Sequence, residues 1–199
     1  MNYFFSIEKD REVETKIKRS TFIAHLHYVG TMKEAKDYIS KIAAEHKTAN
    51  HNCWAYIVGD KGETFHSSDA GEPSGTAGQP MLNTLKKYNM TNVAIVVTRY
   101  FSGTKLGIRG LIDAYGQSVE NAIAKSPLKK LVKTVGFNIT TTYDFGEILK
   151  HKITNMGVTI SDIEYSDKIK LKISIEDHDK EKLEKYLKEM EKAGKIIVS

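Results

Sequence analysis

A short polar stretch, residues 67–78, holds the densest set of chemically capable side chains in the sequence. It contains three glycines, two carboxylates and four hydroxyl groups, and an expected helix start follows it. Glycines permit unusual backbone shapes, and free amides at a helix N-terminus hold anions. Carboxylates act as acid–base groups or cation ligands. We therefore expect the 67–78 loop to bind a phosphate or carboxylate group, with candidate side chains on Asp69, Glu72, Ser74 and Thr76.

The 67–78 loop also admits a purely structural role. Asp, Ser and Thr side chains commonly hydrogen-bond to the amides of their own turn, and Asp69, Ser74 and Thr76 are of these types. Two catalytic motifs do not fit, because no lysine stands at P-loop spacing and the 71–75 spacing differs from a nucleophile elbow. The sequence therefore does not support ATP hydrolysis or α/β-hydrolase chemistry. Two roles of the loop stay open: binding a ligand, and stabilising the loop's own conformation.

A second segment, residues 98–110, is expected to be a strand-to-helix loop that carries cations. Arg99, Lys105 and Arg109 are candidate contacts to a polyanion. Tyr100 and Phe101 add aromatic rings that stack on bases or fill the core, with core filling favoured for Phe101. Interleaved basic and aromatic residues are typical of surfaces that bind single-stranded nucleic acid.

Cysteine and histidine raise the question of a nucleophile or a metal site. Cys53 is the only cysteine, so it has no second cysteine with which to complete a zinc set. We expect it to be a small buried hydrophobe at the start of a strand. His25 and His27 would share one face of a strand without suitably spaced acidic partners. The sequence therefore predicts no metal site, and it indicates no particular cofactor.

Composition restricts the class of protein. Apolar residues make up 40% of the 199-residue chain and charged residues 28%, which is typical of a folded globular protein. A lone cysteine, together with the lack of a cationic-then-apolar leader after Met1, predicts a cytoplasmic protein. No apolar run approaches the roughly 20 residues of a membrane span. The formal charge of +5 fits either an anionic partner such as RNA or an ordinary solvated surface.

The first two thirds of the chain must position these groups. Thr31 and Glu34 have capping-box spacing at the start of an amphipathic pattern, and the nearly continuous apolar run before Thr98 is typical of a buried central strand. Pro80 suits a first helical turn. The predicted elements are a helix over 31–46, a hairpin of strands 53–58 and 63–66, a helix from 80 to 88, a strand over 92–98 and a helix over 111–123.

The last third predicts a separate domain. A lysine-rich polar bridge places the boundary between 127 and 134, which gives domains over 1–130 and 134–199. The remaining pattern is strand 134–141, helix 143–155, strand 158–165, strand 168–175, helix 179–192 and strand 195–198. This βαββαβ order is that of a ferredoxin-like fold. Pairs Glu181/Lys185 and Glu184/Lys188 are expected on the outer face of the last helix.

Four stretches together resemble the IMPACT family, in particular its bacterial, YigZ-like members. They are KRSTFIA at 18–24, ANHNCWAY at 49–56, SSDAGEPSGTAGQPML at 67–82 and TRYFSGTKLGIRGLIDAY at 98–115. The resemblance implies an α+β chain. Its N-terminal domain would be similar to the domain-two fold of ribosomal protein S5, and its C-terminal, ferredoxin-like domain would resemble a C-terminal domain of elongation factor G. Ser102, Arg109 and Asp113 depart from the usual family pattern, in which glycine, glycine and a basic residue are typical.

The function implied by this resemblance is regulation of translation. Eukaryotic relatives act as translational regulators through a kinase-activation pathway, whereas no activity is firmly assigned to the bacterial ones. We therefore expect a binding protein whose partner is RNA, the ribosome or a translation-factor complex. Two alternatives stay open: an enzyme acting on a small phosphorylated or nucleotide ligand through the 67–78 loop, and a protein–protein interaction module.

Overall fold

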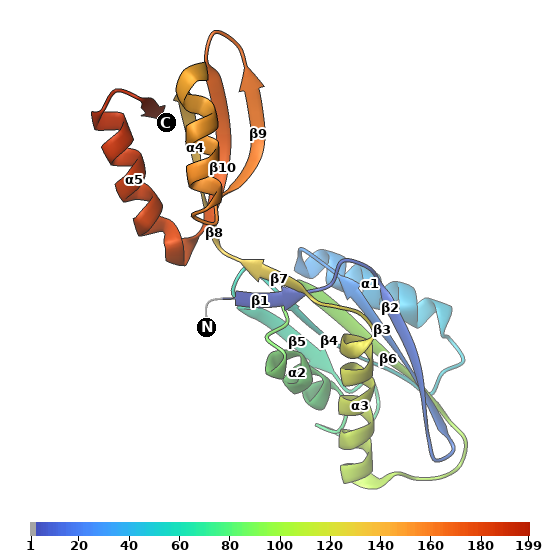
Figure 1. Cartoon of the computed structure of the whole chain (residues 1–199). Helices are drawn as coiled ribbons and strands as arrows, with labels where there is room; N and C mark the ends of the chain where they lie inside the picture. Colours follow the sequence, from blue (N-terminus) through green and yellow to red (C-terminus); the bar gives the residue numbers. More distant parts are fainter. Residues whose placement is uncertain (1–2) are drawn as a thin grey trace. The chain divides into compact units, whose positions relative to one another are not determined.

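The computed structural model describes residues 3–199, which form two compact units, Tyr3–Leu131 and Val132–Ser199. Each unit combines helices with antiparallel sheet (Figure 1), so the predicted α+β class is confirmed. The units are described separately below. No helix in the described part of the chain is long and apolar enough to cross a membrane.

The first unit is organised around a five-stranded sheet of order β2-β3-β6-β4-β5. Its strands are β2 (Arg11–Ile17), β3 (Ser20–Tyr28), β4 (His51–Val58), β5 (Thr64–Ser68) and β6 (Val93–Phe101). The central position of β6 confirms the prediction drawn from its apolar run, since residues Val93–Val97 are fully buried. β4 and β5 form the predicted hairpin.

Helices cover both faces of this sheet. α1 (Met32–Glu45) packs on one face, where Ala35 meets Tyr56 and Ala94, and α2 (Gly78–Lys87) and α3 (Gly107–Ala124) pack on the other (Figure 1). The start of α1 confirms the predicted cap, because Thr31 Oγ1 accepts a hydrogen bond from the Glu34 amide at 3.2 Å. Alternate residues of β4 and β6 therefore contribute to two separate cores.

Several predicted boundaries were wrong because tertiary pairing extends the elements. β6 continues to Phe101, since Ser20 of β3 pairs with Phe101 and His51 of β4 pairs with Arg99. Arg99 and Tyr100 thus lie in a strand rather than in the expected 98–110 loop. α2 and α3 begin a few residues earlier than predicted. The expected polar bridge contains β7 (Lys129–Val132), which pairs with β1 (Tyr3–Ser6).

The second unit has the predicted βαββαβ order and a four-stranded sheet of order β11-β8-β10-β9. Its elements are β8 (Thr134–Thr141), α4 (Tyr143–Thr154), β9 (Thr159–Tyr165), β10 (Ile169–Glu176), a short 3-10 turn (Asp177–Asp179), α5 (Lys180–Lys192) and β11 (Ile196–Val198). Leu149 and Ile153 of α4 and Leu183 and Leu187 of α5 build the core with Leu171 of β10. The ferredoxin-like fold is confirmed.

The charges of α5 are arranged differently from the prediction. Glu184 pairs with Lys180 at 3.4 Å, one turn toward the N-terminus of the helix. Among residues 3–199, no ion pair joins Glu181 to Lys185 or Glu184 to Lys188. Lys185 is therefore left without the carboxylate partner that the four-residue spacing suggested.

The close approach of β5 to the start of α2 gives a stability prediction. A Cβ on Gly78 would lie 2.7 Å from the backbone N and C atoms of Ser68, whereas one on Gly116 of α3 would meet nothing nearer than 3.5 Å. We expect Gly78→Ala to lower the free energy of unfolding by about 1–3 kcal/mol, although alanine favours helix. Gly116→Ala should raise it by about 0.5–1 kcal/mol.

Urea unfolding measures both changes. Trp54 is the only tryptophan and lies in the first unit, so its fluorescence follows that unit alone. Equal effects of the two substitutions would contradict the backbone contact between β5 and α2.

Candidate functional site

Asp69 holds the 67–78 loop in shape. Its Oδ2 atom accepts a hydrogen bond from the Gly75 amide at 2.8 Å, and its Oδ1 atom accepts from the Ala77 and Gly78 amides, each at 2.9 Å. Burial opposes ionisation of this carboxyl group, but the three N–H donors outweigh it and lower the pKa of Asp69. The helix-start amides that could have held an external anion are thus already bonded to Asp69.

The hydroxyl groups of the loop are also bonded locally. Thr76 is buried and its Oγ1 donates to the Pro73 carbonyl oxygen at 2.6 Å. Ser68 Oγ accepts from the Ala70 amide at 3.2 Å. Ser74 lies exposed between these turns. These contacts agree with the structural alternative for Asp69 and Thr76.

Glu72 points inward from the loop and forms a buried ion pair. Its Oε1 atom accepts from the Arg99 guanidinium at 2.5 Å and from the Tyr115 hydroxyl at 2.9 Å. The side chains of Glu72 and Arg99 are only 3% and 6% exposed. Arg99 also donates to Ser20 Oγ at 3.2 Å, and its guanidinium carbon lies 5.4 Å from the Phe22 ring centre. The pair thereby ties the loop to β3, β6 and α3.

Cys53 and His51 complete the surroundings of this pair. Cys53 Sγ donates to the Asp69 carbonyl oxygen at 2.9 Å and lies 3.3 Å from Tyr115 Oη. Burial raises the pKa of the Cys53 thiol to about 12, so it stays a thiol at neutral pH. His51 Nδ1 lies 3.0 Å from the Ala70 carbonyl oxygen and therefore carries the hydrogen, while Nε2 lies 3.9 Å from Glu72 Oε1. Burial also raises the pKa of Tyr115.

The predicted site residues are therefore divided between separate places. Glu72 and Arg99 meet, and Asp69 lies beside them in the same loop. Tyr100 follows Arg99 in β6 and so points to the opposite face of the sheet, where its hydroxyl lies 2.9 Å from His46 Nδ1. Because of this alternation, Arg99 and Tyr100 cannot contact one ligand together.

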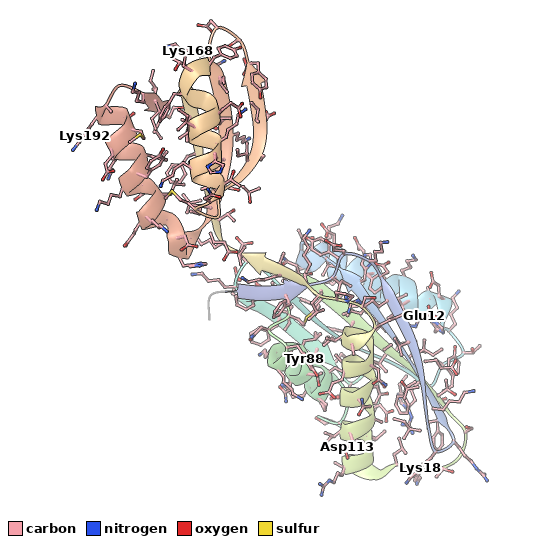
Figure 2. The ribbon with its side chains drawn as sticks, in the orientation of Figure 1. Glu12, Lys18, Tyr88, Asp113, Lys168 and Lys192 are labelled. Atoms are coloured by element: carbon pink, nitrogen blue, oxygen red, sulfur yellow. The ribbon has the colours of Figure 1, made fainter. Side chains whose placement is uncertain are left out.

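Lys105 and Arg109 lie apart from the buried pair, at the edge of the first unit. Both are exposed, as are Lys18 and Arg19 in the turn between β2 and β3. We call these four cations the hairpin–α3 rim, because the turn and the start of α3 are neighbours. A hollow of about 340 Å³ between the turn and α3 is lined by Leu106, Gly110 and Asp113, among others, and by Lys18, which is the one cation of the four in its lining. Figure 2 shows Lys18 and Asp113 at this end of the unit.

The three departures from the family pattern also lie in this region. Ser102 Oγ donates to the Arg19 carbonyl oxygen, which joins the β6–α3 connection to the β2–β3 turn. Asp113 lines the hollow, and Arg109 is exposed on the first turn of α3. Ser102 thus has a structural role in placing the hairpin–α3 rim.

Sequence reasoning missed two members of the buried network. Ser20 and Tyr115 entered the sequence analysis only as parts of the 18–24 and 98–115 stretches, without a role of their own. The signal was a phenol on an otherwise apolar helix face, because a buried tyrosine hydroxyl requires a partner.

Across the described residues, no three His, Cys, Asp or Glu side chains gather in a way that could hold a metal ion.

Asp69 generates a pH prediction. Its pKa is lower in the folded chain than in the unfolded one, so its contribution is fully present above the unfolded value of about 3.9 and is lost as the pH falls through the folded value. Asp69→Asn should lower the free energy of unfolding by about 2 kcal/mol at neutral pH, and by progressively less as the pH falls below the unfolded value and through the lower folded one. Urea unfolding at several pH values measures this, with the exposed Asp113→Asn as control. A difference independent of pH would refute the role of the charge.

The buried ion pair predicts strong coupling in a double-mutant cycle. Glu72→Gln should destabilise the first unit by about 3–5 kcal/mol because it leaves the Arg99 charge buried without its partner. Arg99→Met added to Glu72→Gln should cost little more, or restore stability. The control cycle uses the exposed pair Lys87–Glu120, where we expect coupling of about 0.5 kcal/mol. Additive effects at Glu72 and Arg99 would show that the two side chains act independently.

Comparison with known proteins places the chain in a family. The model of the Impact N-terminal domain matches residues 18–123. IMPACT family member YvyE of Bacillus subtilis (strain 168) is 35% identical over 192 residues, which cover 96% of this chain and 88% of the relative. IMPACT family member YigZ of Escherichia coli (strain K12) is 35% identical over 133 residues, 66% of this chain and 65% of the relative.

A solved structure is similar over the whole chain. It is described as the crystal structure of a hypothetical protein, and it matches with a TM-score of 0.63 and 26% identity over 100% of this chain and 97% of its own. The domain match and the similarity to YvyE over nearly the whole chain lead to one conclusion. The chain belongs to the IMPACT family.

Proposed function

We propose that this protein is a cytoplasmic, translation-associated regulatory protein that binds RNA or the ribosome through the hairpin–α3 rim. One observation carries the proposal: the charges of the 67–78 loop are bonded inside the unit, whereas the rim cations face solvent. Among residues 3–199, no ion pair involves Lys18, Arg19, Lys105 or Arg109. Unpaired exposed cations are the groups that neutralise phosphates and release counterions.

The distribution of charge supports the same surface. Residues 1–131 carry the whole formal charge of +5, because acidic and basic residues are equal in number over 132–199. Arg99 contributes nothing to the exposed charge, since Glu72 neutralises it. The exposed cations of the first unit therefore supply the long-range attraction to a polyanion.

The family resemblance supports translation as the setting. The fold types it implies are similar to a ribosomal protein and an elongation factor, and its eukaryotic members are translational regulators. Fold likeness by itself is an associational argument. The partner is therefore assigned from the chemistry of the rim, and translation is the setting in which a polyanionic partner of this kind is abundant.

The geometry does not favour the enzymatic alternative. A general acid or base must reach a substrate, but Glu72 is buried and Asp69 accepts three amide hydrogen bonds from its own loop. The Cys53 thiol is buried with a raised pKa. A reaction at the 67–78 loop would first require this network to open.

The rim gives a binding prediction. Lys105→Gln with Arg109→Gln should weaken binding to labelled single-stranded RNA or to ribosomes, and should reduce the slope of log affinity against log salt by about 1.4, or about 0.7 for each lost phosphate contact. Lys36→Gln with Lys47→Gln, which removes two exposed cations elsewhere in the unit, should change the slope much less. Fluorescence anisotropy and ribosome co-sedimentation across a salt series measure this.

Two outcomes would count against the proposal in different ways. Absence of association with both RNA and ribosomes at low salt would remove it. Equal losses in the two double variants would place binding outside the rim.

A further inference from the structure

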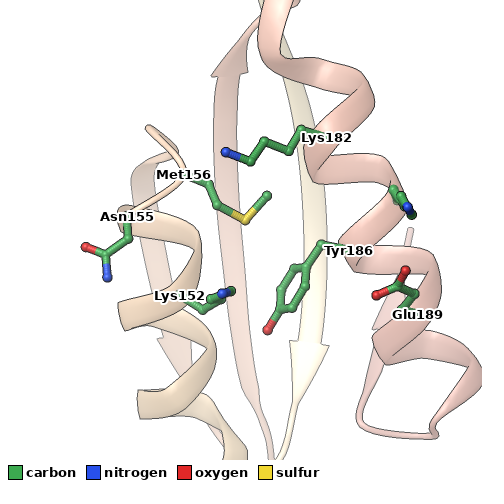
Figure 3. A pocket seen from close by; sticks show the side chains of 7 residues that line it. Lys152, Asn155, Met156, Lys182, Tyr186 and Glu189 are labelled. Carbon is green, nitrogen blue, oxygen red and sulfur yellow. The ribbon is translucent and has the colours of Figure 1, made fainter.

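The second unit contains a groove of about 400 Å³ between its two helices. α4 contributes Lys152, Met156 follows that helix, and α5 contributes Lys182, Lys185, Tyr186 and Glu189. Figure 3 shows Lys182 and the Tyr186 ring directed from α5 toward α4, with Met156 facing them. The volume lies within the range of small-molecule sites.

The groove concentrates cations that have no carboxylate partner. Lys152, Lys182 and Lys185 take part in no ion pair with any described residue, and Glu189 is the single acidic residue in the lining. On the same helices, Lys180 pairs with Glu184 and Lys150 with Glu147, whereas Lys188 and Lys192, which lie outside the groove lining, have no ion pair with a described residue. The unit as a whole is neutral, and three of its unpaired lysines line this one groove.

Lys182 adds positive charge near the start of a helix. It is the third residue of α5, in a turn whose free amides already carry partial positive charge. Asp179 at the N-cap and Glu181 in the same turn carry negative charge, but neither forms an ion pair with Lys182. A bound anion would supply a direct partner for the lysines that line the groove.

Two side chains in the wall of the groove, Met156 and Tyr186, are largely apolar. Met156 and Tyr186 are half-buried and pack against the core of the second unit, so the two side chains are held in place. Burial raises the pKa of Tyr186, which keeps its phenol protonated and able to donate a hydrogen bond. A thioether facing an aromatic ring provides a slot for a flat, polarizable group such as a nucleobase.

The open face of the sheet lacks these features. The register places Lys170 beside Thr140 and Lys172 beside Asn138 on the face away from the helices, and Lys170 is paired with Glu164 at 3.0 Å. These positions carry none of the aromatic rings with which sheet-type RNA-binding domains stack bases. The helical side of the unit is the better candidate for recognising a nucleotide.

We propose that the groove between α4 and α5 binds a nucleotide, with its phosphate held by Lys152, Lys182 and Lys185 and its base between Met156 and Tyr186. The nucleotide is either free or one unit of an RNA chain, since both present the same phosphate and base. This site is separate from the hairpin–α3 rim and does not depend on the function proposed for the rim.

The test follows the methyl signal of Met156 by NMR in the full chain. The chain has six methionines, and Met156→Leu identifies the signal. AMP, inorganic phosphate and a single-stranded RNA are titrated separately. We expect the Met156 signal to shift with AMP or RNA, and Lys182→Gln with Lys185→Gln to weaken that binding by about tenfold or more. The control, Lys188→Gln with Lys192→Gln, removes the same charge from α5 outside the groove lining.

Each outcome decides the proposal. A shift with AMP supports a free nucleotide, and a shift with RNA alone supports a unit of the chain as the source. A Met156 signal unmoved by both, equal responses to phosphate and AMP, or equal losses in the two double variants would overturn it. RNA binding that leaves the Met156 signal unchanged would overturn the groove while leaving the function proposed for the rim intact.

Discussion

The first unit depends on the buried ion pair between Glu72 and Arg99. Removing two charges from water is costly, and the cost is recovered only when each charge has close partners. Here Glu72 also accepts from Tyr115, and Arg99 also donates to Ser20. The pair thus joins a loop, two strands and a helix, and any movement of the 67–78 loop would leave a charge buried alone. This constraint makes the loop part of the core rather than a mobile lid.

Because side chains alternate along β6, the residues that stabilise the unit and the cations available to a partner lie in different places. Successive side chains of a strand point to opposite faces, so Arg99 is committed to the α2 and α3 side while Tyr100 meets His46 on the α1 side. The cations that stay available to a partner come after the strand ends, at Lys105 and Arg109, and from the neighbouring turn, at Lys18 and Arg19. Recognition in this unit is therefore expected at its rim and not at its most distinctive loop.

The two units present their cations in different chemical settings. The rim carries exposed, unpaired cations, which suit a polyanion bound through its backbone. The groove of the second unit combines unpaired lysines with a thioether and a phenol, which suits one phosphate together with one base. The first unit has a net positive charge and the second is neutral overall, so any long-range attraction to a polyanion would come from the first.

The sequence by itself determined the elements whose signals are local. The cap at Thr31, the apolar run that became the central strand β6 and the βαββαβ order all follow from patterns within a few neighbouring residues. It also singled out the 67–78 loop and the residues Glu72 and Arg99. Only the tertiary structure decided that these two neutralise each other, because their pairing requires β6 to continue through Arg99 between β3 and β4. The same holds for the groove, whose lysines come from two helices that meet only when both pack on one sheet.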